Sequence, residues 1–119
     1  MGLNKKIRED VYKKYNGCCA YCGEEIKYKD MQVDHILSKA KGGLNEISNY
    51  NPSCRSCNHY KRTLDLDGFR EYMETLHKRI SNDYITKIGI RYGIVVLKPF
   101  DGKFYFEKSI FEEESAEWR

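Results

Sequence analysis

Two CxxC pairs decide the fold of this chain: Cys19-Ala20-Tyr21-Cys22 and Cys54-Arg55-Ser56-Cys57, with residues 23–53 between them. Each CxxC turn points two thiolates at one ion, and four thiolates complete the tetrahedral shell that Zn²⁺ prefers. Disulfides are the less favoured alternative, because the N-terminal residues do not resemble a secretory signal. A closed four-thiolate shell leaves no position for a substrate or an activated water, so the predicted zinc is structural.

Cys18 is the fifth cysteine and stands directly before the first pair. It is an alternative to Cys19 as a ligand, in a CxxxC turn. The tighter spacing favours Cys19. We therefore expect Cys18 to be a buried thiol outside the zinc site.

Length and composition indicate one soluble domain spanning residues 1–119. The chain has 119 residues, of which 40% are hydrophobic and 33% charged, so it can form a modest core. Its longest apolar run, residues 93–97, is far too short to span a bilayer. We expect no membrane association and a cytoplasmic location. Residues 1–62 carry 12 basic and 7 acidic side chains, a mild excess that favours a polyanionic partner.

Periodicity and turn residues predict an α+β fold. The expected elements are a helix over residues 4–15, a short strand over 31–36, a loop over 39–51, a helix from about Cys54, a helix from Asp65 or Asp67 to Ile80 with Tyr72 and Met73 in its apolar face, a hairpin of 94–98 with 103–107, and a final helix over 109–118. The order strand, loop and helix between and after the cysteine pairs is the part that bears on function.

Polar side chains are concentrated between and just after the cysteine pairs. Asp34 and His35 end the predicted strand, and Asn58 directly follows Cys57. Carboxylate and amide oxygens are hard ligands that suit Mg²⁺, which substrate phosphate oxygens can complete. A histidine with an ordinary pKa of about 6.5 can take a proton from water near neutral pH. These groups suffice for phosphodiester hydrolysis.

The combined pattern resembles the HNH endonuclease family. The residues that carry the resemblance, within a motif core of 19–61, are Cys19-x2-Cys22, Asp34-His35-Ile36, Gly42-Gly43, Asn49 and Cys54-x2-Cys57-Asn58-x2-Lys61. The resemblance implies a ββα-metal (His-Me) finger with a four-cysteine zinc site. By the same resemblance, His35 is the general base, Asp34 and Asn58 bind a catalytic Mg²⁺ or Mn²⁺, and Asn49 braces the loop that carries His35.

Two positions depart from the family pattern or leave an alternative. Ser38 stands where the family often has proline, and His59 is the alternative to Asn58 for the third motif position. Lys61, His59 and Arg62 are expected to contact DNA phosphates, with ordinary surface charge as the alternative for Lys61 and Arg62. The extension over residues 63–119 is more weakly similar to the tail of small phage-type HNH proteins.

The resulting hypothesis is a divalent-metal-dependent HNH endonuclease that hydrolyses DNA. One catalytic centre per chain predicts nicking, and the lack of a recognised sequence reader predicts low specificity. The resemblance implies the host cytoplasm and a phage partner such as the packaging terminase. A non-catalytic zinc-ribbon module that binds nucleic acid is the alternative, and a protein-interaction role for the acidic residues 112–117 is a third.

Overall fold

A computed structural model describes residues 3–108 of the chain. The described residues up to Asp65 and from Phe104 onward form one compact unit, and Leu66–Lys103 form a second. We describe each unit by itself. The predicted helix over 109–118 lies outside the described residues.

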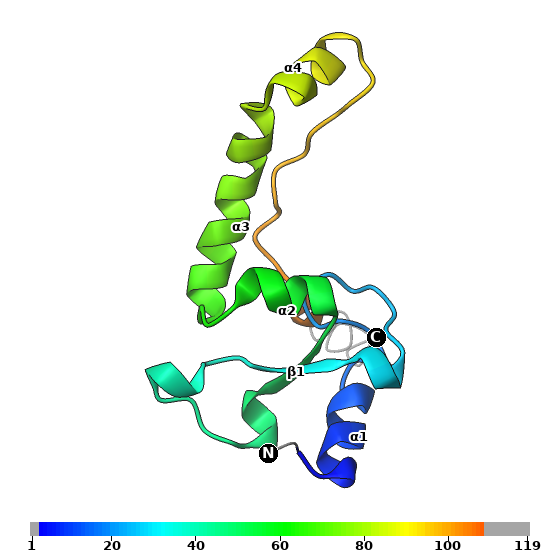
Figure 1. The fold of residues 1–119 in the computed structure, drawn as a ribbon, viewed down its shortest axis with the longest axis vertical. Helices are drawn as coiled ribbons and strands as arrows, with labels where there is room; N and C mark the ends of the chain where they lie inside the picture. The colour runs from blue at the N-terminus through cyan, green and yellow to red at the C-terminus, as the bar shows by residue number, and fades with distance from the viewer. Residues whose placement is uncertain (1–2, 109–119) are drawn as a thin grey trace, which may run out of the picture. The chain divides into compact units, whose positions relative to one another are not determined.

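The first unit is built on a two-stranded antiparallel sheet followed by a helix. Strand β1 is Gln32–His35, strand β2 is Tyr50–Ser53 and helix α2 is Arg55–Lys61 (Figure 1). In the register of the sheet, Asp34 is opposite Asn51 and His35 is opposite Tyr50. The order strand, strand and helix confirms the predicted ββα-type fold.

Strand β2 corrects the sequence prediction, which extended the loop to Asn51. The asparagines and Pro52 are typical of a turn, yet all four residues of β2 are buried. Proline is tolerated here because a two-stranded sheet has only edge strands. The edge of β2 that does not pair with β1 also makes a hydrogen bond: the Pro52 carbonyl accepts from the Ala20 amide at 2.8 Å. Tertiary packing thus overrides the local turn composition.

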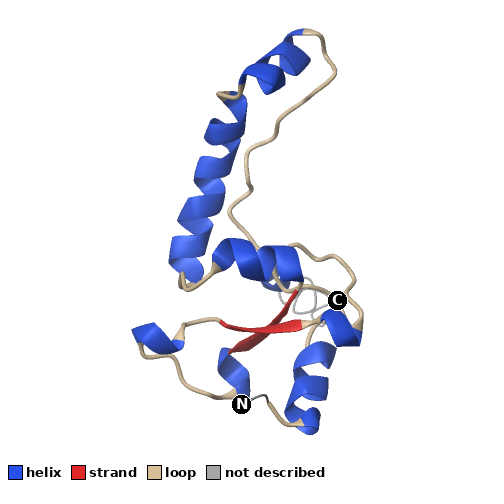
Figure 2. Ribbon diagram, viewed as in Figure 1, coloured by secondary structure: helices blue, strands red, loops and turns tan. Residues whose placement is uncertain are grey.

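Helix α1, Lys5–Lys13, closes one side of the first unit and confirms the predicted N-terminal helix (Figure 2). Asn4 caps it, with the side-chain oxygen accepting from the Ile7 amide at 2.8 Å. Val11 is fully buried and packs with Met31 and Tyr50 in a small core. The helix therefore packs against the residue that precedes β1 and the first residue of β2.

The second unit contains helices α3, Leu66–Ser81, and α4, Tyr84–Arg91. Helix α3 confirms the strongest helical pattern of the sequence, and Phe69 is buried. Tyr72 is wrong as a core residue, since it is 37% exposed. It instead lies under the Arg79 guanidinium, 4.6 Å from the ring centre.

The predicted hairpin of residues 94–98 and 103–107 is wrong. Residues 94–104 form no strand, and residues 105–108 are helical. The Glu107 carboxylate accepts from the Phe104 amide at 2.8 Å, which is one half of a capping box and starts a helix rather than a strand. Ile94 and Val96 are about four-fifths exposed, so no strand pairing stabilises that segment.

Residues 104–108 belong to the first unit. The Tyr105 and Phe106 amides donate to the Tyr21 and Ala20 carbonyls at 3.1 and 2.8 Å. Phe104 itself is 2% exposed. The second unit is therefore an insertion in the sequence of the first unit. After this insertion, the chain rejoins the first unit and packs against the first CxxC pair.

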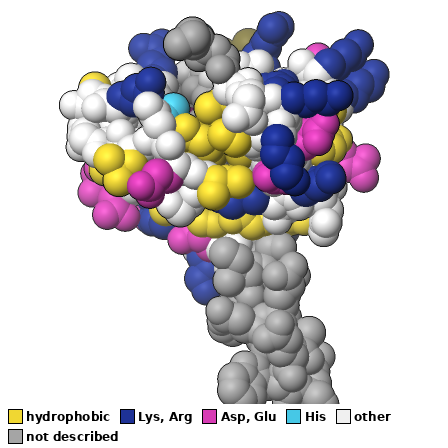
Figure 3. Space-filling model, turned by 90° about the horizontal axis from the view of Figure 1, so that it is seen from below, with side chains coloured by type: hydrophobic (Ala, Val, Ile, Leu, Met, Phe, Trp, Pro, Cys, Tyr) yellow, Lys and Arg dark blue, Asp and Glu magenta, His cyan; other side chains and the backbone are white. Residues whose placement is uncertain are grey.

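The described helices include none that is both long and apolar enough to cross a bilayer. The face of the first unit in Figure 3 carries basic side chains in several separate groups, with acidic side chains between them. The basic excess of residues 1–62 does not form one continuous patch on this face.

Candidate active site

The four cysteines of the two CxxC pairs meet at one point of the first unit. The Sγ atoms of Cys19, Cys22, Cys54 and Cys57 lie within 4.8 Å of one another. Cys22 and Cys54 are 3.9 Å apart. Four sulfurs at the vertices of a zinc tetrahedron, each about 2.3 Å from the ion, are separated by about 3.8 Å. The donor set and its spacing therefore fit a structural zinc ion.

Cys18 lies outside this cluster, as the spacing argument predicts. It is half-buried, and its Sγ lies 4.0 Å from the Asn16 carbonyl oxygen. Hydrogen bonds from Cys57 and from backbone amides lower the pKa of Cys19 to about 4. Burial raises the pKa of Cys22 to about 11. The cluster thus already stabilises one thiolate, and a bound cation would favour the others.

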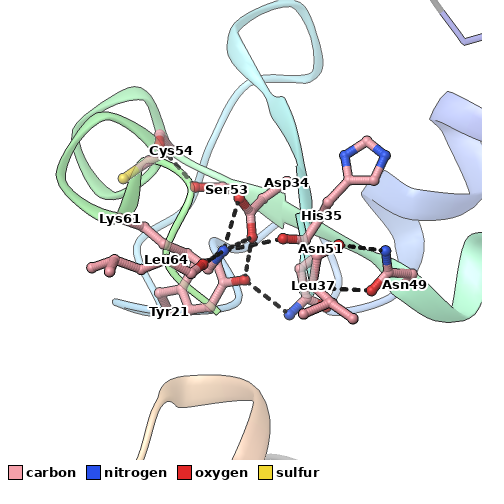
Figure 4. Close-up of polar contacts among 10 residues, drawn as sticks. All are labelled: Tyr21, Asp34, His35, Leu37, Asn49, Asn51, Ser53, Cys54, Lys61 and Leu64. Atoms are coloured by element: carbon pink, nitrogen blue, oxygen red, sulfur yellow. Dashed lines mark hydrogen bonds and ion pairs between the residues drawn. The ribbon is translucent and has the colours of Figure 1, made fainter. Parts of the chain in front are cut away.

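Asp34 is held in a buried polar network at the end of β1. It is 4% exposed. The Tyr21 hydroxyl donates to its Oδ2 at 2.5 Å, and Lys61 Nζ lies 3.1 Å from Oδ2 and 3.4 Å from Oδ1 (Figure 4). Burial raises the pKa of the Asp34 carboxyl, and the Tyr21 and Lys61 donors oppose that rise.

Lys61 is the clearest correction to the predicted site. It is 0% exposed, so its ammonium does not reach a phosphate on the surface. Besides Asp34, Nζ donates to the His35 and Leu64 carbonyls at 3.1 and 2.7 Å. An ammonium group is buried only when such partners replace water. Here Asp34 and His35 come from β1, which is remote from α2 in sequence, and Leu64 lies three residues after Lys61. Lys61 is an internal residue of the site and not a DNA contact.

The His35 side chain points away from the Asp34 network. Figure 4 shows its ring directed away from Tyr21 and Lys61. Its Nε2 lies 3.1 Å from Oδ1 of Asn45. The ring also packs edge-on against Tyr50, with centroids 5.1 Å apart. Because an amide oxygen only accepts, this contact is a hydrogen bond in the tautomer that carries the proton on Nε2, and that tautomer leaves the Nδ1 lone pair available.

Asn45 is a site residue that the sequence analysis missed. It lies in a loop rich in asparagine and glycine, where an amide is most often a turn residue. Only its position ten residues from His35, at the far end of the Gly42-Gly43 turn, could have singled it out.

Asn49 lies inside the loop between β1 and β2 and makes three hydrogen bonds across it. Its Oδ1 accepts from the Leu37 amide, and its Nδ2 donates to the Leu37 and Leu44 carbonyls, each at 2.9 Å. Gly43 fits where the loop crosses itself, since an added Cβ would lie 1.7 Å from the Leu37 oxygen. These contacts place the backbone next to Asn45, which in turn contacts His35.

Asp34, His35 and Asn58 line one open cavity of about 310 Å³, together with Arg62. The Asn58 side chain makes no hydrogen bond to another described residue, so its oxygen is free to act as a ligand. His59 lies on an adjoining cavity of about 490 Å³ with Arg55 and Gln32. Arg62 and His59 are both exposed, as a contact with DNA requires.

The donor set at the cavity fits a small hard cation. An ionised carboxylate offers about four acceptor positions, and Tyr21 and Lys61 do not use all of those on Asp34. Asp34 and Asn58 line the same cavity, and their oxygens are of the kind that Mg²⁺ and Mn²⁺ prefer, with water or phosphate completing the shell.

Comparisons with known proteins point to one family. Residues 19–71 match the family model described as HNH endonuclease. The chain is 25% identical over 141 residues to the "SPbeta prophage-derived putative HNH endonuclease YoqL" of Bacillus subtilis (strain 168). That alignment covers 98% of this chain and 53% of the relative, so the chain spans about half the length of that protein.

A solved structure is also similar: the Type II-C Cas9 enzyme from Actinomyces naeslundii. The TM-score is 0.51 at 28% identity, over 59% of this chain and 8% of the Cas9 chain. The match therefore concerns a small portion of that enzyme. Together, the family model, the prophage-derived relative and this structure confirm the resemblance drawn from the sequence.

Proposed function

We propose, from the similarity of residues 19–71 to the HNH endonuclease family, that this chain is a divalent-metal-dependent endonuclease that hydrolyses phosphodiester bonds in DNA. The single observation that carries the proposal is the cavity shared by Asp34, His35 and Asn58. It brings a base and two hard oxygen ligands to one opening, which is what such hydrolysis requires.

Each residue has a separate part in the proposed reaction. Asp34 and Asn58 hold Mg²⁺ or Mn²⁺, and when bound such an ion supplies charge stabilisation to the phosphate and the leaving oxygen. His35 takes a proton on Nδ1 from the attacking water. Asn45 orients the His35 ring through Nε2, and Asn49 holds the loop that carries Asn45. The cysteine cluster holds a structural Zn²⁺ and takes no part in the chemistry.

The number of catalytic centres and the kind of DNA contacts determine the expected product and the expected specificity. One catalytic centre cuts one strand, so a single chain should nick DNA. Arg62 and His59 provide phosphate contacts beside the cavity, and such contacts are blind to sequence. The name of the relative is that of a prophage-derived protein, which supports a phage context. We propose that a phage protein, such as a packaging protein, supplies targeting in the host cytoplasm.

A second candidate function is a zinc-ribbon module that binds nucleic acid without cutting it. The observation in its favour is that Lys61 already neutralises the charge of Asp34, so that carboxylate is satisfied without a divalent ion. The two candidates differ in whether any divalent ion produces cleavage.

Supercoiled plasmid tests the proposal directly. The purified protein is incubated with Mg²⁺, Mn²⁺ or EDTA, beside His35→Ala and the control His77→Ala, whose histidine lies in α3 of the second unit. Open circles with either ion, absent with EDTA and with His35→Ala but present with His77→Ala, support the nuclease. A shift of the plasmid on a gel without cleavage supports the second candidate. A parallel reaction with RNA defines the substrate class.

A further inference from the structure

We propose that Tyr21 and Lys61 are positioning residues that hold the Asp34 carboxylate in place for the catalytic ion. The inference rests on the proposed function, because it concerns the ion that Asp34 would bind. We call the pair the Asp34 clamp. The clamp links the proposed ion site to both CxxC pairs, because Tyr21 lies inside the first pair and Lys61 follows the second pair in α2.

The origin of the two clamp residues ties them to the cysteine cluster. Tyr21 stands between Cys19 and Cys22, inside the first CxxC pair. Lys61 follows Cys57 by four residues in α2, and residues four apart lie on the same face of a helix. A metal ion that fixes Cys22 and Cys57 therefore also fixes the backbone from which both clamp side chains extend.

The Tyr21 side chain is immobilised along its whole length. It is 5% exposed, and its ring packs edge-on against Phe104 with centroids 5.3 Å apart. Its hydroxyl donates to Asp34 at 2.5 Å and accepts from the Asn51 amide nitrogen at 3.4 Å. The hydroxyl is thereby directed at the carboxylate from a fixed point, which a rotating surface tyrosine could not achieve.

Lys61 holds the same carboxylate from a different element, helix α2. Its Nζ contacts both Asp34 oxygens and also the carbonyl of His35, the residue that follows Asp34 in β1 (Figure 4). One ammonium thus sets the positions of the proposed metal ligand and of the backbone that carries the proposed base. Residues that orient a ligand in this way commonly change metal affinity by about 10- to 100-fold when they are removed.

Tyr21→Phe is the test variant, because it deletes one hydroxyl and keeps the ring packed against Phe104. Tyr84→Phe is the matched control: Tyr84 is 75% exposed and lies in the second unit. Binding of Mn²⁺ alone, without DNA, is measured by electron paramagnetic resonance on the zinc-loaded full chain. Zinc content and melting temperature are measured on the same samples.

We expect Tyr21→Phe to bind Mn²⁺ about 10-fold more weakly than wild type, with unchanged zinc content and Tyr84→Phe equal to wild type. Cleavage by Tyr21→Phe should recover as Mn²⁺ is raised, with kcat close to wild type. A role in folding alone would instead lower the melting temperature and would not be rescued by the ion. Equal Mn²⁺ affinity in Tyr21→Phe and wild type overturns the inference.

Asp34→Asn separates failure of the inference from failure of the proposed function. If Asp34→Asn weakens Mn²⁺ binding and Tyr21→Phe does not, the clamp is wrong and the nuclease proposal stands. If Asp34→Asn binds Mn²⁺ as wild type does, Asp34 is not a ligand and both proposals fall.

Discussion

Replacing Lys61 by methionine should destabilise the first unit severely. Lys61 is 0% and Asp34 4% exposed, so the variant leaves a carboxylate buried without its cation. Removing one partner of a buried ion pair costs about 3–5 kcal/mol. Each kcal/mol lowers the melting temperature of a domain of 60–100 residues by about 4–8 °C. We therefore expect the melting temperature to fall by at least about 12 °C.

Circular dichroism melts at a fixed zinc concentration measure this effect, with Lys13→Met as the control because Lys13 is exposed on α1. The double variant Lys61→Met with Asp34→Asn should recover part of the loss, since no unpaired charge remains. A Lys61→Met melting temperature within about 4 °C of wild type, which corresponds to about 1 kcal/mol, would refute the buried pair. Weaker DNA binding by a stable Lys61→Met protein would then restore the surface role predicted from sequence.

Three further perturbations test other parts of the site. Cys54→Ser should lose zinc and unfold, as judged by metal analysis and circular dichroism, and a folded zinc-free protein would contradict the structural role of the cluster. Asn45→Ala should lower kcat by about 10-fold with unchanged DNA affinity in EDTA, whereas Asn45→Asp keeps an acceptor for His35 Nε2. The tautomer of His35, read from imidazole ¹⁵N shifts, should change only in Asn45→Ala; an unchanged tautomer excludes the orienting role. Phe104→Ala should cost about 3–5 kcal/mol in urea unfolding, and a cost below about 1 kcal/mol would show that the return of the chain does not support the first unit.

The sequence predicted the parts of the structure that depend on local pattern. The cysteine spacing predicted the cluster and the exclusion of Cys18 from it, and periodicity predicted helices α1 and α3. It missed β2 because asparagine and proline are typical of turns, and the burial that makes these residues a strand comes from elements distant in sequence. The predicted hairpin is wrong for the same reason, since Phe104 packs on Tyr21, more than 80 residues earlier.

Lys61 shows what kind of information the pattern lacks. A lysine in the last turn of a helix that follows a zinc cysteine is normally exposed, because burial of an ammonium needs a buried counter-charge. Here the counter-charge is at the end of the strand on which the helix packs, and the helix ends at Arg62 with φ of 55°, a turn that brings the Leu64 carbonyl back onto Nζ. The turn at Arg62 is local to Lys61, but the counter-charge lies 27 residues earlier in the sequence, where the local pattern does not reveal it. A lysine one turn after a zinc cysteine should therefore be compared with the acidic residues of the facing strand before it is assigned to DNA, and in this chain that comparison leads to Asp34.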